Sequence, residues 1–258
     1  MCTFIIFNRP DHPWPILIAA NRDERLDRPW LPPAAHWPER PDVIAGQDEL
    51  AGGSWLGMNS SGVVAGILNR EGTLGPQAGK RSRGELVLDA LDFPDAIDGA
   101  EALGSLDPYA YRPFNMVIAD NRDAFLLVHR GEPDGAPIAV EPLPEGLSMI
   151  TARERDDPRS PRIRHYRPLF VAAAAPDPDT GDWRAWEALL ASRDREPGSG
   201  PGGAMFIEPD PAVGVSNFGT SSSSLIALPA IESAEKQPIW RFTSGRPEDW
   251  IWRDMARF

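Results

Sequence analysis

The sequence predicts an α+β protein in which antiparallel sheets carry helices on their outer faces. Short apolar runs rich in Val, Ile, Leu, Phe and Trp recur in pairs joined by polar turns, as in β-hairpins. Runs of strands and runs of helices follow one another, without strict alternation. The 28 prolines and 23 glycines in 258 residues indicate many short elements. This order fits two sheets packed back to back between helical layers, and it leaves a two-layer sandwich open.

Three hairpins are predicted in the first half of the chain. The first strand begins almost at the N-terminus, because the apolar run that opens the chain is followed by a polar, proline-containing turn. The hairpins pair residues 2–8 with 15–21, 54–59 with 63–69, and 116–119 with 124–128.

Four helices are predicted, two on each side of the third hairpin. Ser82 and Glu85 have capping-box spacing, in which each side chain bonds the other residue's amide, and the helix they begin should end near Pro94. Asp182 is the expected N-cap of the last helix, which carries a stripe of Trp and Leu. The second and third helices are expected over 95–103 and 163–174, the last over 183–191, and the remaining strands over 204–208, 225–228 and 239–243.

Composition excludes several classes of function. The net charge of −12 argues against nucleic acid or an anionic membrane surface as partner, since both need a basic face. No apolar stretch reaches the length of about 18 residues that a membrane span needs. A single cysteine allows no disulfide and no cysteine-based zinc site, and the four histidines lack ligand spacing. We therefore expect one cytoplasmic domain over residues 1–258 that acts on a small molecule and holds no metal.

Cys2 is the residue that most directly suggests chemistry. Methionine aminopeptidases remove Met1 when the next side chain is small, and this leaves a thiol and a free α-amine on one residue. With an ordinary pKa of about 8, the amine is partly neutral at pH 7 and can take the thiol proton. Composition alone favours the alternative, a buried structural cysteine in an apolar strand.

The polar segment 21–24 (Asn-Arg-Asp-Glu) ends the second predicted strand. If residues 2–8 and 15–21 pair, this segment lies beside Cys2. A guanidinium there would lower the pKa of the thiol, and a carboxylate would orient the ammonium group. A charged exit from a strand is the simpler alternative, and the pairing makes the functional interpretation competitive.

Two further segments are weaker signals. The paired glycines before the second hairpin allow close backbone approach, and Asn69 at the hairpin's end could offer an N–H to an oxyanion. The run 218–224 (Phe-Gly-Thr-Ser-Ser-Ser-Ser) has the composition of a linker. It leads directly into an apolar run, so a polar-faced strand lining a cleft is equally open.

Taken together, these residues resemble the NRDE family, which is related to Transport and Golgi organisation protein 2 and named for the Asn-Arg-Asp-Glu found here at 21–24. The family is similar in turn to cysteine N-terminal-nucleophile (Ntn) hydrolases of the choloylglycine and penicillin V acylase type. The resemblance runs over most of the chain: Met1-Cys2-Thr3, 21–24, Gly52–Gly57, Asn59, Gly62, Asn69, Ser82-Arg83-Gly84, Pro113-Phe114-Asn115, Gly146-Leu147-Ser148 and Phe218-Gly219-Thr220.

The resemblance implies a four-layer αββα fold with its site at the N-terminus. It implies Cys2 as nucleophile, Arg22 and Asp23 as its supporting charges, and Asn69 near the oxyanion hole. The residues expected to contribute to substrate binding are Asn21, Glu24, Trp55 and Asn115.

Two positions depart from the family pattern. NRDE proteins usually read Gly-Leu-Ser-Asn, where the last residue matches an acylase oxyanion donor, and this chain has Met149 there. A thioether cannot donate a hydrogen bond, so the expected cost is about 3 kcal/mol of barrier. Ser221 stands where the family often has an anion-recognising Arg, which is either absent here or replaced by Arg70 or Arg241.

The function implied is an Ntn-type cysteine amidohydrolase or acyltransferase that acts on a linear amide of unknown identity and needs no cofactor. The alternative is a non-catalytic protein that handles haem or acyl lipids on the same scaffold, as proposed for eukaryotic relatives. Met149 favours the alternative, because a binding protein tolerates the loss of an oxyanion donor and a catalyst does not.

Overall fold

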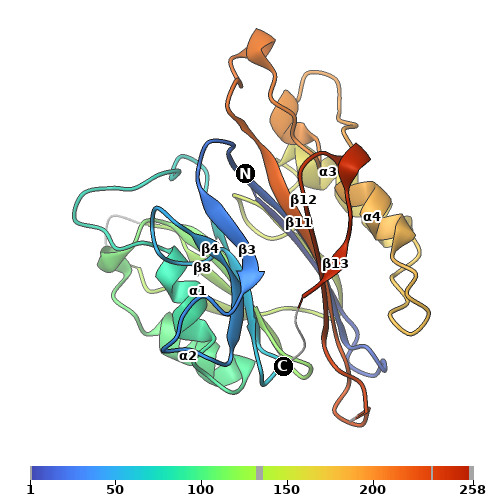
Figure 1. The fold of residues 1–258 in the computed structure, drawn as a ribbon. Helices are drawn as coiled ribbons and strands as arrows, with labels where there is room; N and C mark the ends of the chain where they lie inside the picture. Colours follow the sequence, from blue (N-terminus) through green and yellow to red (C-terminus); the bar gives the residue numbers. More distant parts are fainter. Residues whose placement is uncertain (1, 132–135, 234, 256–258) are drawn as a thin grey trace.

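Two antiparallel sheets stacked between two pairs of helices form the protein (Figure 1). The computed structural model describes residues 2–131, 136–233 and 235–255. The helices lie outside the sheets, and the sheets face each other across a shared apolar core. The predicted α+β class and its four-layer αββα arrangement are confirmed, and the two-layer sandwich is excluded.

One sheet has six strands in the order β10-β1-β2-β11-β12-β13. Its two central hairpin strands pair so that Thr3 lies opposite Asn21, which brings the start of the chain beside residues 21–23. The strands are β1 (Thr3–Asn8), β2 (Ile16–Arg25), β10 (Gly146–Ile150), β11 (Phe218–Leu228), β12 (Ile239–Ser244) and β13 (Arg253–Asp254).

The other sheet has seven strands, and each strand pairs with its neighbours in sequence. Most connections of this meander are short, but the segment between Asn69 and Phe114 contains two helices. Its strands are β3 (Trp30–Ala34), β4 (Val43–Asp48), β5 (Leu56–Asn59), β6 (Val64–Asn69), β7 (Phe114–Ala119), β8 (Ala124–His129) and β9 (Ala139–Pro142).

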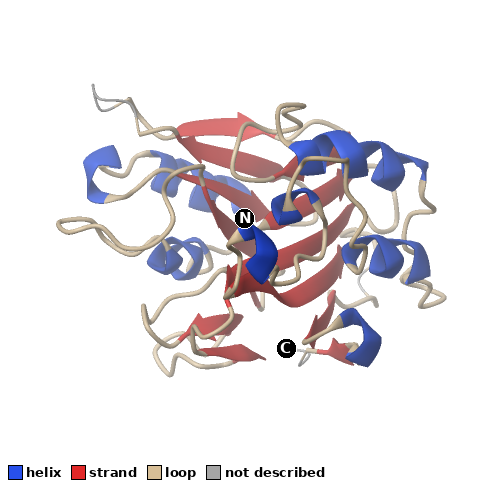
Figure 2. Cartoon of the chain, turned by 90° about the horizontal axis from the view of Figure 1, so that it is seen from above, coloured by secondary structure: helices blue, strands red, loops and turns tan. Residues whose placement is uncertain are grey.

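Each sheet is covered on its outer face by two helices, and in the view from above helices lie on both sides of the central strands (Figure 2). Helices α1 (Gly84–Ala90) and α2 (Ala96–Gly104) pack on the seven-stranded sheet, and α3 (Pro161–Ala172) and α4 (Arg184–Leu190) on the other. No helix in the described ranges is long and apolar enough to cross a membrane. Short 3-10 turns occur at Pro108–Ala110, Pro201–Gly203, Pro211–Val213 and Pro247–Asp249.

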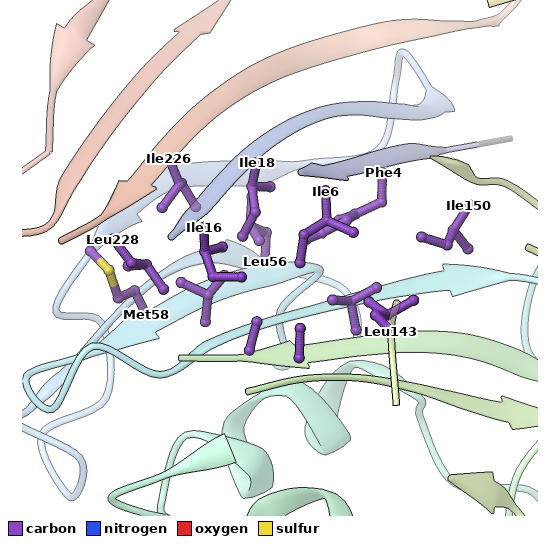
Figure 3. Packing of buried hydrophobic residues seen from close by; sticks show 14 of the residues in the cluster. Phe4, Ile6, Ile16, Ile18, Leu56, Met58, Leu143, Ile150, Ile226 and Leu228 are labelled. Carbon is purple, nitrogen blue, oxygen red and sulfur yellow. The ribbon is translucent and has the colours of Figure 1, made fainter. Parts of the chain in front are cut away.

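The core between the sheets is built from alternate residues of each strand. In β1, Phe4 and Ile6 point into this inter-sheet core, where Figure 3 shows them near Leu56 and Ile18, while Ile5 points to the outer core with α3 and α4. Neighbouring side chains of a strand face opposite sides of the sheet. On each strand, therefore, only every second side chain can reach the space between the sheets.

Several predicted elements differ from the structure. The strand expected over 204–208 is a buried loop, and the strand expected over 225–228 begins at Phe218, so the serine run is part of β11. The four strands at the sheet edges, β3, β9, β10 and β13, were not predicted, and neither was β4. The other predicted strands and all four helices are present, with ends shifted by a few residues.

Both predicted helix caps are wrong in detail. Helix α1 has Arg83 at its N-cap with no side-chain hydrogen bond, and the Glu85 carboxylate pairs with Arg81, four residues before it, so no capping box forms. Helix α4 has Trp183 at its N-cap, although the Asp182 carboxylate accepts from the Arg184 amide at 3.2 Å.

Candidate active site

A pocket lies between the sheets where β1 begins and β6 ends. It encloses about 320 Å3 of space not filled by atoms, part of which is open solvent. The six-stranded sheet contributes Cys2, Arg22 and Ser222 to its wall, and the facing wall comes from the seven-stranded sheet, chiefly Trp55 and Leu68.

Cys2 immediately precedes β1, and its side chain packs against the inter-sheet core. The thiol donates to the backbone carbonyl of Asp23, with Sγ 3.6 Å from the oxygen. Burial raises the pKa of the Cys2 thiol above its ordinary value and the Asp23 carboxylate raises it further, while the Arg22 charge lowers it. The resting sulfur is therefore a neutral thiol that needs a base before it can attack.

We expect alkylation of Cys2 by iodoacetamide to have a pH midpoint above the ordinary thiol pKa of about 8.5. Alkylation needs the thiolate, and a raised pKa lowers the thiolate fraction at pH 7, so the rate should rise mainly at higher pH. Because Cys2 is the sole cysteine, mass spectrometry of the labelled full chain reports this site alone. A midpoint below that of a cysteine peptide would contradict the assignment of a neutral thiol.

Arg22 lies directly across from Cys2, because the pairing of Thr3 with Asn21 makes Cys2 and Arg22 the next opposed pair. Its guanidinium donates to Ser221 Oγ at 3.0 Å and lies over the Trp55 ring, with Cζ 4.4 Å from the ring centre. Arg22 is 5% exposed, and burial lowers the pKa of its guanidinium. The site thus places a buried cation beside the thiol.

Asp23 points to the opposite face of the sheet, where it meets Thr220 of the run 218–224 and Arg162, which the sequence analysis missed. Arg162 of α3 donates to Asp23 Oδ2 and Thr220 donates to Oδ1, each at 2.7 Å. Arg162 also donates to Thr3 Oγ1, so it joins both strands of the hairpin. The spacing along the helix could have indicated that Arg162 is buried. It lies four residues before the buried Tyr166 and therefore on the same apolar face of α3.

The serine run supplies one wall of the pocket. A register shift between Thr220 and Ser222 turns Ser221 toward Arg22, whose backbone carbonyl accepts from Ser221 Oγ at 3.1 Å. Ser222 and Ser224 line the pocket, and Ser224 Oγ accepts from the Trp240 indole at 3.1 Å. Of the two interpretations of this run, the polar-faced strand is confirmed.

Two residues expected to bind substrate have side chains committed to the fold. Asn21 donates to the carbonyls of Leu190 and Met205 at 3.1 and 3.0 Å, and its side chain thereby joins β2 to the loop that was expected to be a strand. Asn115, 0% exposed, donates to the carbonyls of Thr151 and Arg153 at 2.8 and 2.6 Å. Buried backbone acceptors need such partners, so we assign both side chains a structural role.

Glu24 and Asn69 lie at the periphery of the pocket. Glu24 is half-buried, and its carboxylate accepts from the Arg25 amide at 2.8 Å. Asn69 ends β6, but the pocket wall on that strand is formed by Ile67 and Leu68. The structure therefore brings Cys2, Arg22 and Trp55 together and leaves Glu24 and Asn69 beside them.

Two glycines near the pocket are required by close packing, and one of them, Gly46, leaves room for the Trp55 ring. A Cβ on Gly46 would lie 2.3 Å from the Trp55 ring, and a Cβ on Gly53 would lie 2.4 Å from the carbonyl carbon of Gly84. Real Cβ atoms do not approach so closely, so these positions need glycine for packing. The close backbone approach predicted for the paired glycines occurs at Gly53.

The expectation that residue 149 faces the oxyanion is wrong, and so is the suggestion that Arg70 or Arg241 replaces the family's arginine. Met149 pairs with Ile5 and lies with it in the outer core, so a side chain at this position points away from Cys2 and cannot donate to an oxyanion there. Arg70 is held by Asn115 and Glu154, and Arg241 by Glu187 on the outer face. Neither arginine replaces the family's arginine at position 221.

Among the described residues, no group of three or more His, Cys, Asp or Glu side chains could hold a metal ion.

Comparison with known sequences gives a family match. The family model described as "Transport and Golgi organisation 2" matches residues 1–180. The "Transport and Golgi organization protein 2 homolog" of Homo sapiens is 35% identical over 144 residues, and the homolog of Mus musculus 32% over 149 residues. Each alignment covers 52% of this chain and 50% of the relative, so the chain spans about half the length of the curated relatives it matches.

Solved structures with the same fold are Ntn hydrolases. A mutant of the conjugated bile acid hydrolase from Clostridium perfringens superposes with a TM-score of 0.53 and 14% identity, over 99% of this chain and 92% of that one. The Caenorhabditis elegans ortholog of N-acylethanolamine-hydrolyzing acid amidase gives 0.54 and 13%, over 91% and 96%. At this identity the likeness establishes the Ntn hydrolase fold alone.

Proposed function

We propose that this chain, which belongs to the Transport and Golgi organisation 2 family, is a cysteine amidohydrolase or acyltransferase of the Ntn type that acts on a linear amide. The observation that supports this most is the position of Cys2, whose thiol lies in a pocket between the sheets directly across from the buried Arg22. Loss of Met1 would add the α-amine that the thiol needs as its base.

In the proposed first step the thiol proton passes to the Cys2 α-amine as Sγ attacks the amide carbon. A C–S bond forms and the carbonyl electrons move to oxygen, close to the Arg22 guanidinium. The Asn69 backbone amide is the second proposed donor. Ile67 N–H donates to the Trp55 carbonyl, and by alternation Asn69 N–H points to the same edge of β6, beyond the last β5 pair at Leu56.

In the second step the C–N bond breaks and the leaving amine takes the proton from the Cys2 ammonium. This leaves an acyl thioester on Cys2. Water then attacks the thioester while the α-amine again accepts a proton, which releases the acid and restores the thiol. If another amine attacks in place of water, the same chemistry is an acyl transfer.

The alternative, haem binding, fits this site poorly. Thiolate ligation of haem iron needs an ionised sulfur, and burial raises the pKa of the Cys2 thiol. The pocket is also small, because its 320 Å3 of space not filled by atoms includes open solvent, so the enclosed part is smaller still. No contact of the described residues favours an acyl-lipid carrier over a hydrolase.

The test is to trap the acyl-enzyme with an activated acyl ester and locate it by peptide mass spectrometry. We expect one acyl group on Cys2 of protein whose Met1 has been removed. A version extended at its N-terminus, which keeps the thiol but has no α-amine on Cys2, should still be alkylated and should not turn over amides. Equal amide turnover by the extended protein, or an active protein that retains Met1, would contradict the proposed mechanism.

A further inference from the structure

Arg22 and Arg162 are the two buried arginines of the described chain, and their surroundings differ. Arg162 has a carboxylate partner in Asp23 at 2.7 Å. Arg22 has no carboxylate within ion-pair distance in the part of the chain that the structure describes. Among the described residues, its guanidinium donates one hydrogen bond, to the Ser221 hydroxyl. A buried charge is costly unless an opposite charge compensates it, so the Arg22 site lacks an anion.

The acidic residues nearest to Arg22 do not supply that anion. Among the acidic groups Cys2 acts most strongly on the pKa of Arg22, but its resting thiol is neutral, and Glu24 and Asp48 have weaker effects. The Asp48 carboxylate is already bound by Arg28 at 2.7 Å. The missing partner therefore has to come from outside the described chain.

The aromatic contacts of Arg22 leave the edge of its guanidinium open. Trp55 lies 4.4 Å and Trp30 5.9 Å from Cζ, measured to the ring centres, so the rings contact the guanidinium through their π faces. A guanidinium has five N–H donors, of which Ser221 takes one. The hydroxyl of Ser222 lines the same pocket and makes no hydrogen bond to a described residue. These donors suit a planar acceptor with two oxygens, which is a carboxylate.

We propose that Arg22, assisted by Ser222, binds a carboxylate of the substrate, so that the preferred amide is an N-acyl α-amino acid; this rests on the proposed function of the same pocket. Cys2 and Arg22 follow directly on the opposed pair Thr3 and Asn21, and residues opposed in this way have Cβ atoms about 4.5–5.5 Å apart. An α-carboxylate is separated from the amide carbon by only the nitrogen and Cα, which matches this short spacing. The apolar wall at Phe4, Leu56 and Leu68 is left for the acyl chain.

The test compares two amides that share one acyl chain, an N-acylglycine and an N-acylethanolamine, which differ by a carboxylate against a hydroxymethyl group. We expect kcat/KM to favour the N-acylglycine by about 10- to 100-fold, the range for hydrogen bonds to charged groups. In Arg22→Met turnover of both amides should fall and the ratio should approach one. In Arg28→Met, which removes a nearby charge outside the pocket wall, the ratio should be kept.

Binding to the Cys2→Ala protein separates this inference from the proposed function. Calorimetry should give a lower Kd for the N-acylglycine than for the N-acylethanolamine, and the difference should vanish when Arg22→Met is added. If neither amide is turned over but this difference is found, the proposed catalysis fails and the carboxylate site stands. Turnover with equal kcat/KM for both amides, or a preference that persists in Arg22→Met, overturns the carboxylate site and leaves the hydrolase proposal intact. Equal Kd values for the two amides also overturn it.

Discussion

Cys2→Ala should lower kcat for amide hydrolysis by at least about a thousand-fold, because removing a covalent nucleophile leaves only binding and electrostatic stabilisation. The side chain is partly exposed at the start of β1, so the loss of one sulfur should change the free energy of unfolding little. The measurement is turnover of the N-acylglycine and N-acylethanolamine pair, with thermal unfolding of the same samples.

Cys2→Ser is the matched variant, since it keeps a small residue after Met1 and supplies a weaker nucleophile. We expect it to retain a trace of activity and to accumulate an ester in place of the thioester. Full turnover by Cys2→Ala would show that the sulfur takes no part in the reaction, and the serines that line the pocket would become the next candidates.

Arg162→Met should lower the free energy of unfolding by about 3–5 kcal/mol, the usual cost of removing one partner of a buried ion pair. The two side chains are 2% and 0% exposed, and the change removes the guanidinium that holds Asp23 and Thr3 together. For a chain of this size the expected fall in Tm is about 2–4 °C per kcal/mol. Urea unfolding measures the change directly.

Arg164→Met is the control on the same helix. Arg164 pairs with Glu196 on the surface, and such exposed pairs contribute about 1 kcal/mol or less. If Arg162→Met were no more destabilising than Arg164→Met, the buried pair would not be a stability element of this fold. Arg162→Lys should recover part of the loss, because it keeps the charge and loses the fork-shaped donor set.

The strands missed by the sequence analysis have an identifiable cause. Four of the five, β3, β9, β10 and β13, lie at sheet edges, and β3 contains Pro32 and Pro33. Proline in an apolar run normally argues against a strand, but an edge strand has one unpaired side where the missing N–H costs nothing. Whether a run lies at an edge depends on the whole sheet, so the local pattern could not reveal it.

The sequence could predict the part of the candidate site that depends on local contacts, and it could not predict the part that depends on distant ones. The opposition of Cys2 and Arg22 follows from one short hairpin, whose register depends on local sequence. The structural roles of Asn21 and Asn115 depend on backbone carbonyls far away in the chain. The outward orientation of Met149 depends on its pairing with Ile5 of β1, which is equally distant in sequence. Arg162 bonds Asp23 across 139 positions, a distance over which no spacing rule operates.

The chain by itself determined its α+β class, its hairpins, and the meeting of the N-terminal cysteine with residues 21–23, because hydrophobic periodicity and turn residues act over a few positions. Only the tertiary structure decided which face of each strand meets the opposite sheet. That choice turned Arg22 toward Trp55 and left it without a carboxylate, and it turned Asp23 toward Arg162. Adjacent residues of one strand thereby received opposite surroundings, since side chains alternate between faces and only the packing of the second sheet defines what each face contains.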